Sequence, residues 1–177
     1  IMTERVDHDP VRRLLHEAAP DELRYFHMAA ERAQLSTCLQ AHCGAVIIKD
    51  EEIIGEGYNS PPLNSEANRT CLNEYESGRQ RKPQFDTTCC VHAEWRAILD
   101  ACKKNPGKME ESILFFMRID DDGNFRGSGV PRCTTCSRLA MEAGIGTFAL
   151  WSPQEVILFD TDEYDRLSYA FFETSQE

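Results

Sequence analysis

The stretch ILFFMRI, at Ile113–Ile119, is an apolar run in the middle of the chain. Such a run predicts a strand that is covered on both faces, as in a sheet with helices on either side. Before it, apolar residues at helical spacing predict a helix over Val91–Lys104, which Asn105-Pro106-Gly107 ends. After it come a predicted Asp/Gly-rich loop at Asp120–Gly129, a helix from near Cys133 to Gly144 and a strand at Ile145–Trp151.

The flanking sequence adds a hairpin and further helices to this centre. Residues Gly44–Lys49 and Ile53–Tyr58 read as an antiparallel hairpin around an acidic turn. Asp9-Pro10 is typical of a helix start and predicts a short helix through about Ala18. The other predicted elements are a helix over residues 21–36, a short strand at Val156–Phe159 and a terminal helix at Asp162–Phe172. This order indicates an α/β fold with three α/β/α layers, in which a mixed sheet of about five strands lies between helices.

Composition narrows the class of protein. The chain has 177 residues, with 30 acidic against 19 Lys and Arg, a net charge of −11. Its 41% apolar and 28% charged residues are typical of a globular protein, so we expect one domain over residues 21–177 after an N-terminal extension, residues 1–20. Such an acidic chain is a poor general ligand for nucleic acid, and no apolar run reaches the ~18 residues of a membrane span. The polar N-terminal residues lack a secretory apolar segment, so we expect a cytoplasmic protein.

Two short motifs combine metal ligands with a carboxylate. They are His92-Ala93-Glu94 and Cys133-Thr134-Thr135-Cys136, and each stands where a helix is expected to begin. Cysteines three residues apart face the same way in the first turn of a helix, whose N-terminus favours thiolates. One imidazole and two thiolates suit tetrahedral zinc with the fourth position open to water. Glu94, close to the metal but not needed as a ligand, suits a proton carrier.

An H-x-E segment followed by C-x-x-C resembles the cytidine/deoxycytidylate deaminase superfamily. The hairpin end Gly57-Tyr58-Asn59, followed by Pro61-Pro62, and the long cysteine-containing loop before His92 are most similar to the deoxycytidylate (dCMP) deaminases. The resemblance covers roughly residues 25–151. It implies the family's zinc cofactor, its five-stranded mixed sheet, its usual homo-oligomeric assembly and a small nucleotide substrate. The implied reaction is hydrolytic deamination of a free cytosine nucleotide, dCMP to dUMP plus ammonia.

The same resemblance implies a role for each matching residue. His92, Cys133 and Cys136 would bind the zinc ion. Glu94 would deprotonate the water, protonate ring nitrogen 3 of the base and then protonate the departing amine. The backbone N–H of Ala93 would hold the base carbonyl, and Asn59 would contact the sugar or the base edge.

Three positions depart from the family pattern. Arg132 stands immediately before the cysteine pair, where the family has proline. Trp95 follows the glutamate, where smaller polar residues are usual, and Ser60 replaces a glycine after the Gly-Tyr-Asn segment. The cysteine pair is intact, so these departures concern substrate contacts more than zinc binding.

The long loop from Asn59 to about Thr88 leaves alternatives open. The cysteines around it either bind a second, structural zinc, with Cys43 or His42 as a possible further ligand, or are ordinary reduced thiols; they are Cys71, Cys89 and Cys90. Its basic residues either bind a 5′-phosphate or are solvated charges; they are Arg69, Arg79, Arg81 and Lys82. Three aromatic residues near the C-terminus either stack on the base or belong to the core or to an oligomer contact; they are Tyr164, Phe171 and Phe172.

Two rival functions remain at this point. One is deamination of another base or nucleoside, such as cytidine, guanine or adenosine in tRNA, although the net charge argues against a polynucleotide substrate. The other is a non-catalytic assembly module with a structural zinc. Glu94 argues against that module, because a closed structural site has four protein ligands and no need of a nearby base.

Overall fold

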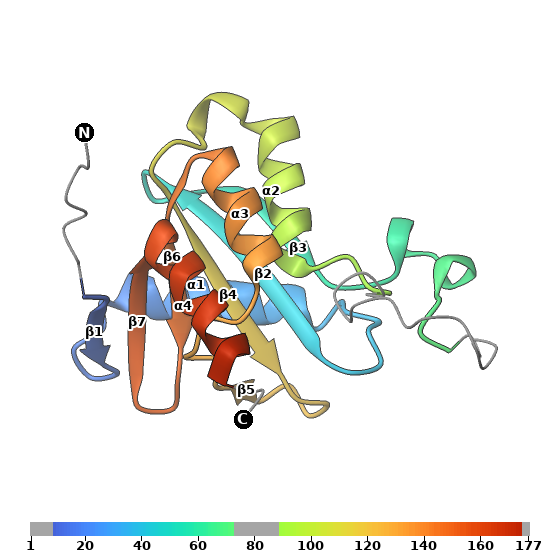
Figure 1. Cartoon of the computed structure of the whole chain (residues 1–177), viewed down its shortest axis with the longest axis horizontal. Helices are drawn as coiled ribbons and strands as arrows, with labels where there is room; N and C mark the ends of the chain where they lie inside the picture. The colour runs from blue at the N-terminus through green and yellow to red at the C-terminus, as the bar shows by residue number, and fades with distance from the viewer. Residues whose placement is uncertain (1–8, 73–88, 175–177) are drawn as a thin grey trace.

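The computed structural model of the chain describes residues 9–72 and 89–174, and it has the expected three-layer α/β/α architecture (Figure 1). One mixed sheet forms the middle layer, in the strand order β1-β7-β6-β4-β2-β3, with β5 paired to β4. It has seven strands, not about five as expected. The strands are β1 (Val11–Leu14), β2 (His42–Lys49), β3 (Glu52–Tyr58), β4 (Ser112–Ile119), β5 (Phe125–Arg126), β6 (Ile145–Trp151) and β7 (Glu155–Asp160).

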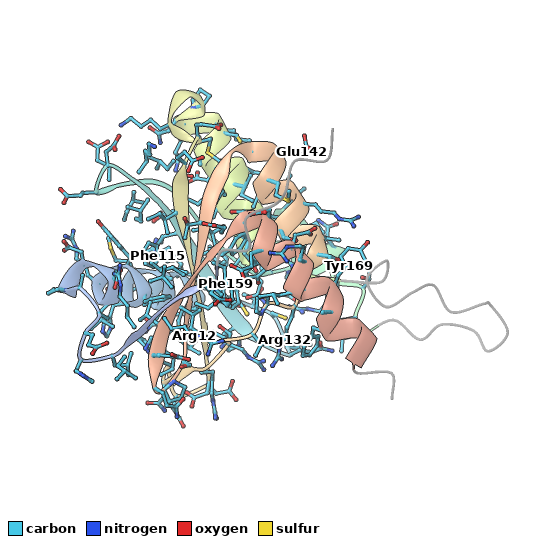
Figure 2. All side chains as sticks on the ribbon, turned by 60° about the vertical axis from the view of Figure 1, so that its left-hand side comes forward. Arg12, Phe115, Arg132, Glu142, Phe159 and Tyr169 are labelled. Carbon is cyan, nitrogen blue, oxygen red and sulfur yellow. The ribbon has the colours of Figure 1, made fainter. Side chains whose placement is uncertain are left out.

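Helices cover both faces of this sheet. Helix α1 (Pro20–Ala33) packs on β2 and β4 from one side. Figure 2 shows α1 on one side of the sheet and the other three helices on the opposite side. These are α2 (Ala93–Lys104), α3 (Thr134–Ala143) and α4 (Thr161–Thr174). None of the helices in the described ranges combines the length and apolar character that crossing a bilayer requires.

Strand β4 lies at the centre of both apolar cores, as its continuous apolar sequence predicts. The Phe115 ring lies 5.0 Å from the ring of Tyr25 and 5.1 Å from that of Phe26, between centroids, on the α1 side. Leu114, the preceding residue, belongs to the core on the opposite side, beneath α2. Neighbouring residues of a strand point to opposite faces, so a strand between two helical layers must be apolar on both.

Small residues let α2 lie very close to β3. Ala93 and Ala97 of α2 are fully buried. A Cβ atom added at Gly57 would lie 2.4 Å from the carbonyl oxygen of Ala93 and 2.5 Å from the backbone nitrogen of Ala97. Only glycine leaves room for this approach. Gly57 therefore sets the distance between the start of α2 and the sheet.

The N-terminal element differs from the prediction. Asp9-Pro10 predicts a helix through Ala18, but Val11–Leu14 forms strand β1, antiparallel to β7, with Val11 opposite Leu158. The helix-start signal is local, whereas the partner strand lies far along the chain and offers ladder hydrogen bonds at its open edge. This part of the expected extension therefore joins the sheet.

The remaining elements agree with the sequence, apart from one addition. The hairpin, the short strand at β7 and the terminal helix α4 all form. Strand β5 is new: it pairs with the end of β4, with Arg126 opposite Arg118, inside the stretch expected to be a loop. The chain after β5 then passes back toward α3, and this return path helps to shape the candidate site.

Candidate metal centre and adjoining pocket

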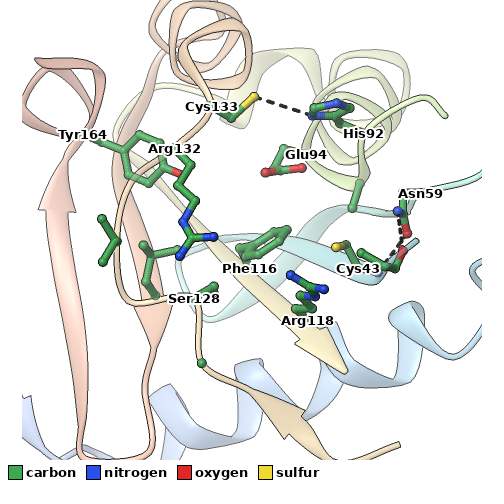
Figure 3. A pocket seen from close by; sticks show the side chains of 15 residues that line it. Cys43, Asn59, His92, Glu94, Phe116, Arg118, Ser128, Arg132, Cys133 and Tyr164 are labelled. Carbon is green, nitrogen blue, oxygen red and sulfur yellow. Dashed lines mark hydrogen bonds between the residues drawn. The ribbon is translucent and has the colours of Figure 1, made fainter. Parts of the chain in front are cut away.

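Three metal-ligating side chains converge where α2 and α3 begin. The Nδ1 atom of His92 lies 3.2 Å from the sulfur of Cys136. It lies 3.5 Å from the sulfur of Cys133, the contact drawn in Figure 3. Their ligand atoms all lie within 4.8 Å of one another, and they are the one such group within residues 9–72 and 89–174. We call these three residues the metal group. The structure thus brings together the three side chains that the sequence predicts as zinc ligands.

Two helix N-termini hold the metal group in place. His92 is the N-cap residue of α2, and Cys133 is the N-cap residue of α3. The sulfur of Cys133 accepts a hydrogen bond from the backbone N–H of Cys136, at 3.3 Å. This cap gives the pair its compact arrangement, and the free N–H groups of a helix start stabilise anionic sulfur.

The three side chains of the metal group differ in how strongly they hold their protons. Hydrogen bonds from Cys136, and then from His92 and Thr135, lower the pKa of Cys133 to about 4, although burial opposes them. Burial raises the pKa of Cys136 well above its ordinary value. Burial acts to lower the pKa of His92, but Cys133 and the charge of Glu94 outweigh it and raise that pKa. One imidazole nitrogen and two sulfur atoms within hydrogen-bonding distance are a donor set suited to zinc. Zinc binding would displace the protons that these atoms carry.

Trp95 supports the imidazole. Its ring stacks on the ring of His92, with centroids 4.4 Å apart and planes 10° from parallel. The stack limits rotation of the imidazole and so helps to keep Nδ1 directed at the two sulfurs. Trp95 therefore positions the imidazole of His92 by stacking on its ring, and Trp95 itself does not line the pocket.

Glu94 is a buried carboxyl beside the metal group. It lies in the first turn of α2, is 6% exposed and projects into the pocket below His92 (Figure 3). Burial raises the pKa of its carboxyl group. A carboxyl with a raised pKa can both accept and return a proton near neutral pH. Glu94 is therefore suited to proton transfer at this position.

The metal group borders a cavity of about 230 Å³. Ala93 lines it, and as the first residue of α2 its backbone N–H has no acceptor within the helix. Asn59 lines it too, but its side-chain oxygen accepts hydrogen bonds from the Ser36 hydroxyl and the Cys43 N–H, at 2.7 and 2.8 Å. Its amide nitrogen donates to the carbonyl of Ala41 at 2.7 Å. Asn59 thus ties the start of β2 to the end of β3, and its second amide N–H has no partner among the described residues.

The basic loop residues have different fates. The guanidinium of Arg69 hydrogen-bonds the Glu66 carboxylate at 2.6 Å and the Thr37 carbonyl at 2.8 Å, and Arg69 does not line the cavity. The other three predicted phosphate ligands lie outside the described residues; they are Arg79, Arg81 and Lys82.

Among the loop cysteines, by which we mean Cys71, Cys89 and Cys90, Cys89 forms hydrogen bonds with both of the others. The sulfur of Cys89 accepts a hydrogen bond from the Thr70 N–H at 3.2 Å. Cys71 is exposed and Cys90 is buried. Within the described residues the loop cysteines form no convergent group of three ligands, with or without His42 and Cys43. A second zinc therefore stays a prediction.

The aromatic residues near the C-terminus divide between core and pocket. Tyr164 does both, since it lines the cavity and stacks on Phe148 with ring centroids 4.1 Å apart. The ring of Phe171 lies under the guanidinium of Arg132, 5.0 Å from its centroid. The side chain of Phe172 lies outside the described residues.

Several cavity residues escape prediction from the sequence. They come from β2, from β4 and from the return path after β5, and they are Cys43, Phe116, Arg118, Ser128 and Val130. Arg118 carries a signal in the sequence, because it is the one charged residue in the apolar run of β4. The others depend on how the chain folds back after β5, which no local pattern reveals.

Known proteins share both sequence and fold with this chain. Over 91 residues it is 34% identical to the deoxycytidylate deaminase of Mycobacterium phage D29, covering 45% of this chain and 66% of that protein. Over 92 residues it is 29% identical to the deoxycytidylate deaminase of Schizosaccharomyces pombe, covering 51% of this chain and 28% of that protein. The chain thus spans just under two-thirds of the phage relative and little over a quarter of the yeast one.

A solved structure shows the same fold. It is the dCMP deaminase of cyanophage S-TIM5 in complex with dCMP and dUMP, with a TM-score of 0.51 and 23% identity, covering 74% of this chain and 81% of that one. The family model described as the cytidine and deoxycytidylate deaminase zinc-binding region matches residues 20–151, which is well over half of the chain. With the metal group and Glu94 inside that match, the chain belongs to the cytidine and deoxycytidylate deaminase family.

Proposed function

We propose that this chain is a zinc-dependent hydrolase that deaminates a free cytosine nucleotide, with dCMP converted to dUMP and ammonia. The observation that carries the proposal is a buried carboxyl, Glu94, placed beside three zinc-type ligands at a cavity of about 230 Å³. The names of its phage and yeast relatives support dCMP as the substrate. The cytoplasmic location and the homo-oligomeric state stay predictions.

The side chains can divide the chemistry as follows. A zinc ion held by the metal group would lower the pKa of a bound water molecule towards neutrality. Glu94 accepts one proton from the attacking water and delivers it to ring nitrogen 3 of the base. It then accepts the proton of the new hydroxyl group and delivers it to the departing amine, so that ammonia leaves and a carbonyl remains. The Ala93 N–H, which has no acceptor within α2, would hold the base carbonyl during both transfers.

An ammonia-release assay tests this proposal. We expect turnover of dCMP above CMP, cytidine, deoxycytidine and guanine in the zinc-loaded protein. Glu94→Gln should keep zinc but lose at least ~10²-fold in kcat, the usual scale of general acid–base help. Glu163→Gln is the matched control, because Glu163 is also a buried carboxyl with a raised pKa but does not line the cavity.

The assay also separates the rival functions. No turnover of any of the five compounds, with zinc fully bound, would contradict the proposal and favour a non-catalytic module. Near-normal turnover by Glu94→Gln would contradict the role of Glu94. Activity on single-stranded nucleic acid, with salt-sensitive binding, would instead favour a polynucleotide substrate.

A further inference from the structure

The cavity has a second end that the proposed chemistry does not use. Away from the metal group, Arg118 of β4 and Arg132, just before α3, both line it (Figure 3). Ser128, on the return path after β5, lines the cavity with them. Figure 3 shows Glu94 between His92 and Phe116, with the Arg132 side chain on one side of the Phe116 ring and the Arg118 side chain on the other. One ligand could therefore touch the metal end and the arginine end together.

The two guanidinium groups carry positive charge that no described carboxylate compensates. Neither Arg118 nor Arg132 forms an ion pair within residues 9–72 and 89–174. By contrast, Arg126, opposite Arg118 across the strand pair, lies 3.4 Å from the Asp120 carboxylate. Arg132 rests on the ring of Phe171, which positions its guanidinium group and leaves the charge in place. In a chain of net charge −11, two uncompensated arginines at one cavity mark a place for an anion.

Ser128 adds an independent observation. Its hydroxyl oxygen is buried and has no hydrogen-bond partner among the described residues. Buried hydroxyls almost always have a partner, so one without a partner in a cavity wall points to a bound ligand. The backbone N–H of Ser128 donates to the Trp151 carbonyl at 3.1 Å, which fixes this segment against β6.

We propose that Arg118, Ser128 and Arg132 form the subsite that binds the phosphate of a nucleoside monophosphate substrate. The inference rests on the proposed function, because it requires the base of the same molecule to reach Glu94. A terminal phosphate offers three oxygens, which match two planar guanidinium forks and a hydroxyl donor. Of the loop residues that the sequence leaves open for this role, Arg69 is held by Glu66 and Thr37, and the other three lie outside the described residues.

Steady-state kinetics with dCMP and deoxycytidine tests the subsite, because these substrates differ only in the phosphate. Arg118→Gln and Arg132→Gln should each lower kcat/KM for dCMP about ten- to a hundredfold, the range of a lost charged hydrogen bond, mainly through KM. Their kcat/KM for deoxycytidine should stay within about twofold of the parent. Ser128→Ala should act in the same direction, by a few-fold.

Arg138→Gln is the matched control. Arg138 also lies over an aromatic ring of α4, with its guanidinium 5.0 Å from the centroid of Tyr169, but it does not line the cavity. It should leave both substrates unaffected. Equal losses for dCMP and deoxycytidine in the Arg118 and Arg132 variants, or no loss for either, would overturn the subsite. If Arg132→Gln does not fold, the Arg118 variant alone decides.

Calorimetric binding of dCMP and deoxycytidine to the zinc-loaded Glu94→Gln protein separates this inference from the proposed function. Tighter binding of dCMP that disappears on adding Arg118→Gln supports the subsite, even if the parent protein turns over none of the compounds. Equal binding of the two compounds, with the parent still active on dCMP, overturns the subsite and leaves the proposed function standing.

Discussion

Two cysteine-bearing regions of the molecule differ in how their sulfur atoms are held. In the metal group, the sulfurs of Cys133 and Cys136 lie in the first turn of α3 and face the imidazole at the start of α2. Among the loop cysteines, the sulfur of Cys89 is bound by a backbone N–H of its own loop. Ligand convergence therefore follows from helix starts packed on one sheet, and a high cysteine count alone does not produce it.

The two regions also differ in acidity. Hydrogen bonds within the metal group bring the pKa of Cys133 to about 4. For Cys89, burial acts to raise the pKa, but hydrogen bonds from Thr70 and Cys71 lower it to about 7. Burial raises the pKa of the adjacent Cys90 to about 12. Neighbouring thiols in the loop thus differ greatly in the fraction present as thiolate at neutral pH.

The largest expected effect comes from removing one sulfur of the metal group. Cys133→Ala should reduce bound zinc from about one ion per chain to nearly none and abolish deamination, because two remaining donors hold zinc poorly. Its melting temperature should fall too, since the ion joins two helix starts. Elemental analysis of purified protein measures the zinc content. Cys102→Ala is the control, because Cys102 is exposed on α2 and is not a candidate ligand of either zinc. A zinc content in Cys133→Ala equal to that of the parent would refute the ligand assignment.

A second prediction concerns a substitution that changes the packing of α2 on β3 and leaves all three side chains of the metal group intact. In Gly57→Ala the new Cβ meets the backbone of Ala93 and Ala97 at 2.4 and 2.5 Å, so α2 must move away from β3. We expect a loss of about 1–3 kcal/mol in the free energy of unfolding, with weaker zinc binding, because His92 and Glu94 move with the helix.

Gly107→Ala serves as its control, since a Cβ there meets nothing within 4 Å. It should change stability by no more than about 0.5 kcal/mol. Denaturant unfolding and zinc titration measure both variants. Equal stability of the two would mean that the close contact of α2 with β3 does not fix the metal group.

The smallest expected effect is a difference in alkylation rate between the two adjacent cysteines Cys89 and Cys90. Iodoacetamide should label Cys89 at a rate that rises as pH increases through about 7 and then levels off, because the thiolate is the reactive form. Cys90 should stay almost unlabelled up to about pH 9, since it is buried and its pKa is near 12. Fragment mass spectrometry distinguishes the two sites, and Cys89→Ser provides the blank. Faster labelling of Cys90 than of Cys89 at pH 7 would contradict this picture.

Each half of the metal site could be predicted because its geometry is local, whereas the meeting of the two halves is implied only by the family resemblance. The spacing of Cys133 and Cys136 within one helical turn, and of His92 and Glu94 at another helix start, fixes which side chains face the same way. The apolar run of β4 likewise shows the three-layer fold, because a strand buried on both faces leaves a distinct pattern.

Other features depend on contacts between distant parts of the chain. Strand β1 is mistaken for a helix because its partner, β7, lies at the other end of the sequence. Ser128 reaches the cavity only because the chain pairs β5 with β4 and then turns back. The stack of Trp95 on His92 is close in sequence, but an aromatic residue in a helix carries no sign of which ring it will cover.

Strand β1 also covers an edge of the sheet that could otherwise pair with other copies of the protein. It occupies the outer edge of β7, whose peptide groups would otherwise point into solvent beside Val156, Ile157 and Leu158. Bare edges of this kind recruit strands from other molecules and seed aggregates. The exposed, charged side chain of Arg12 disfavours strand pairing at the new edge that β1 itself forms. Removal of the chain up to Leu14 would therefore expose the edge of β7 and favour aggregation.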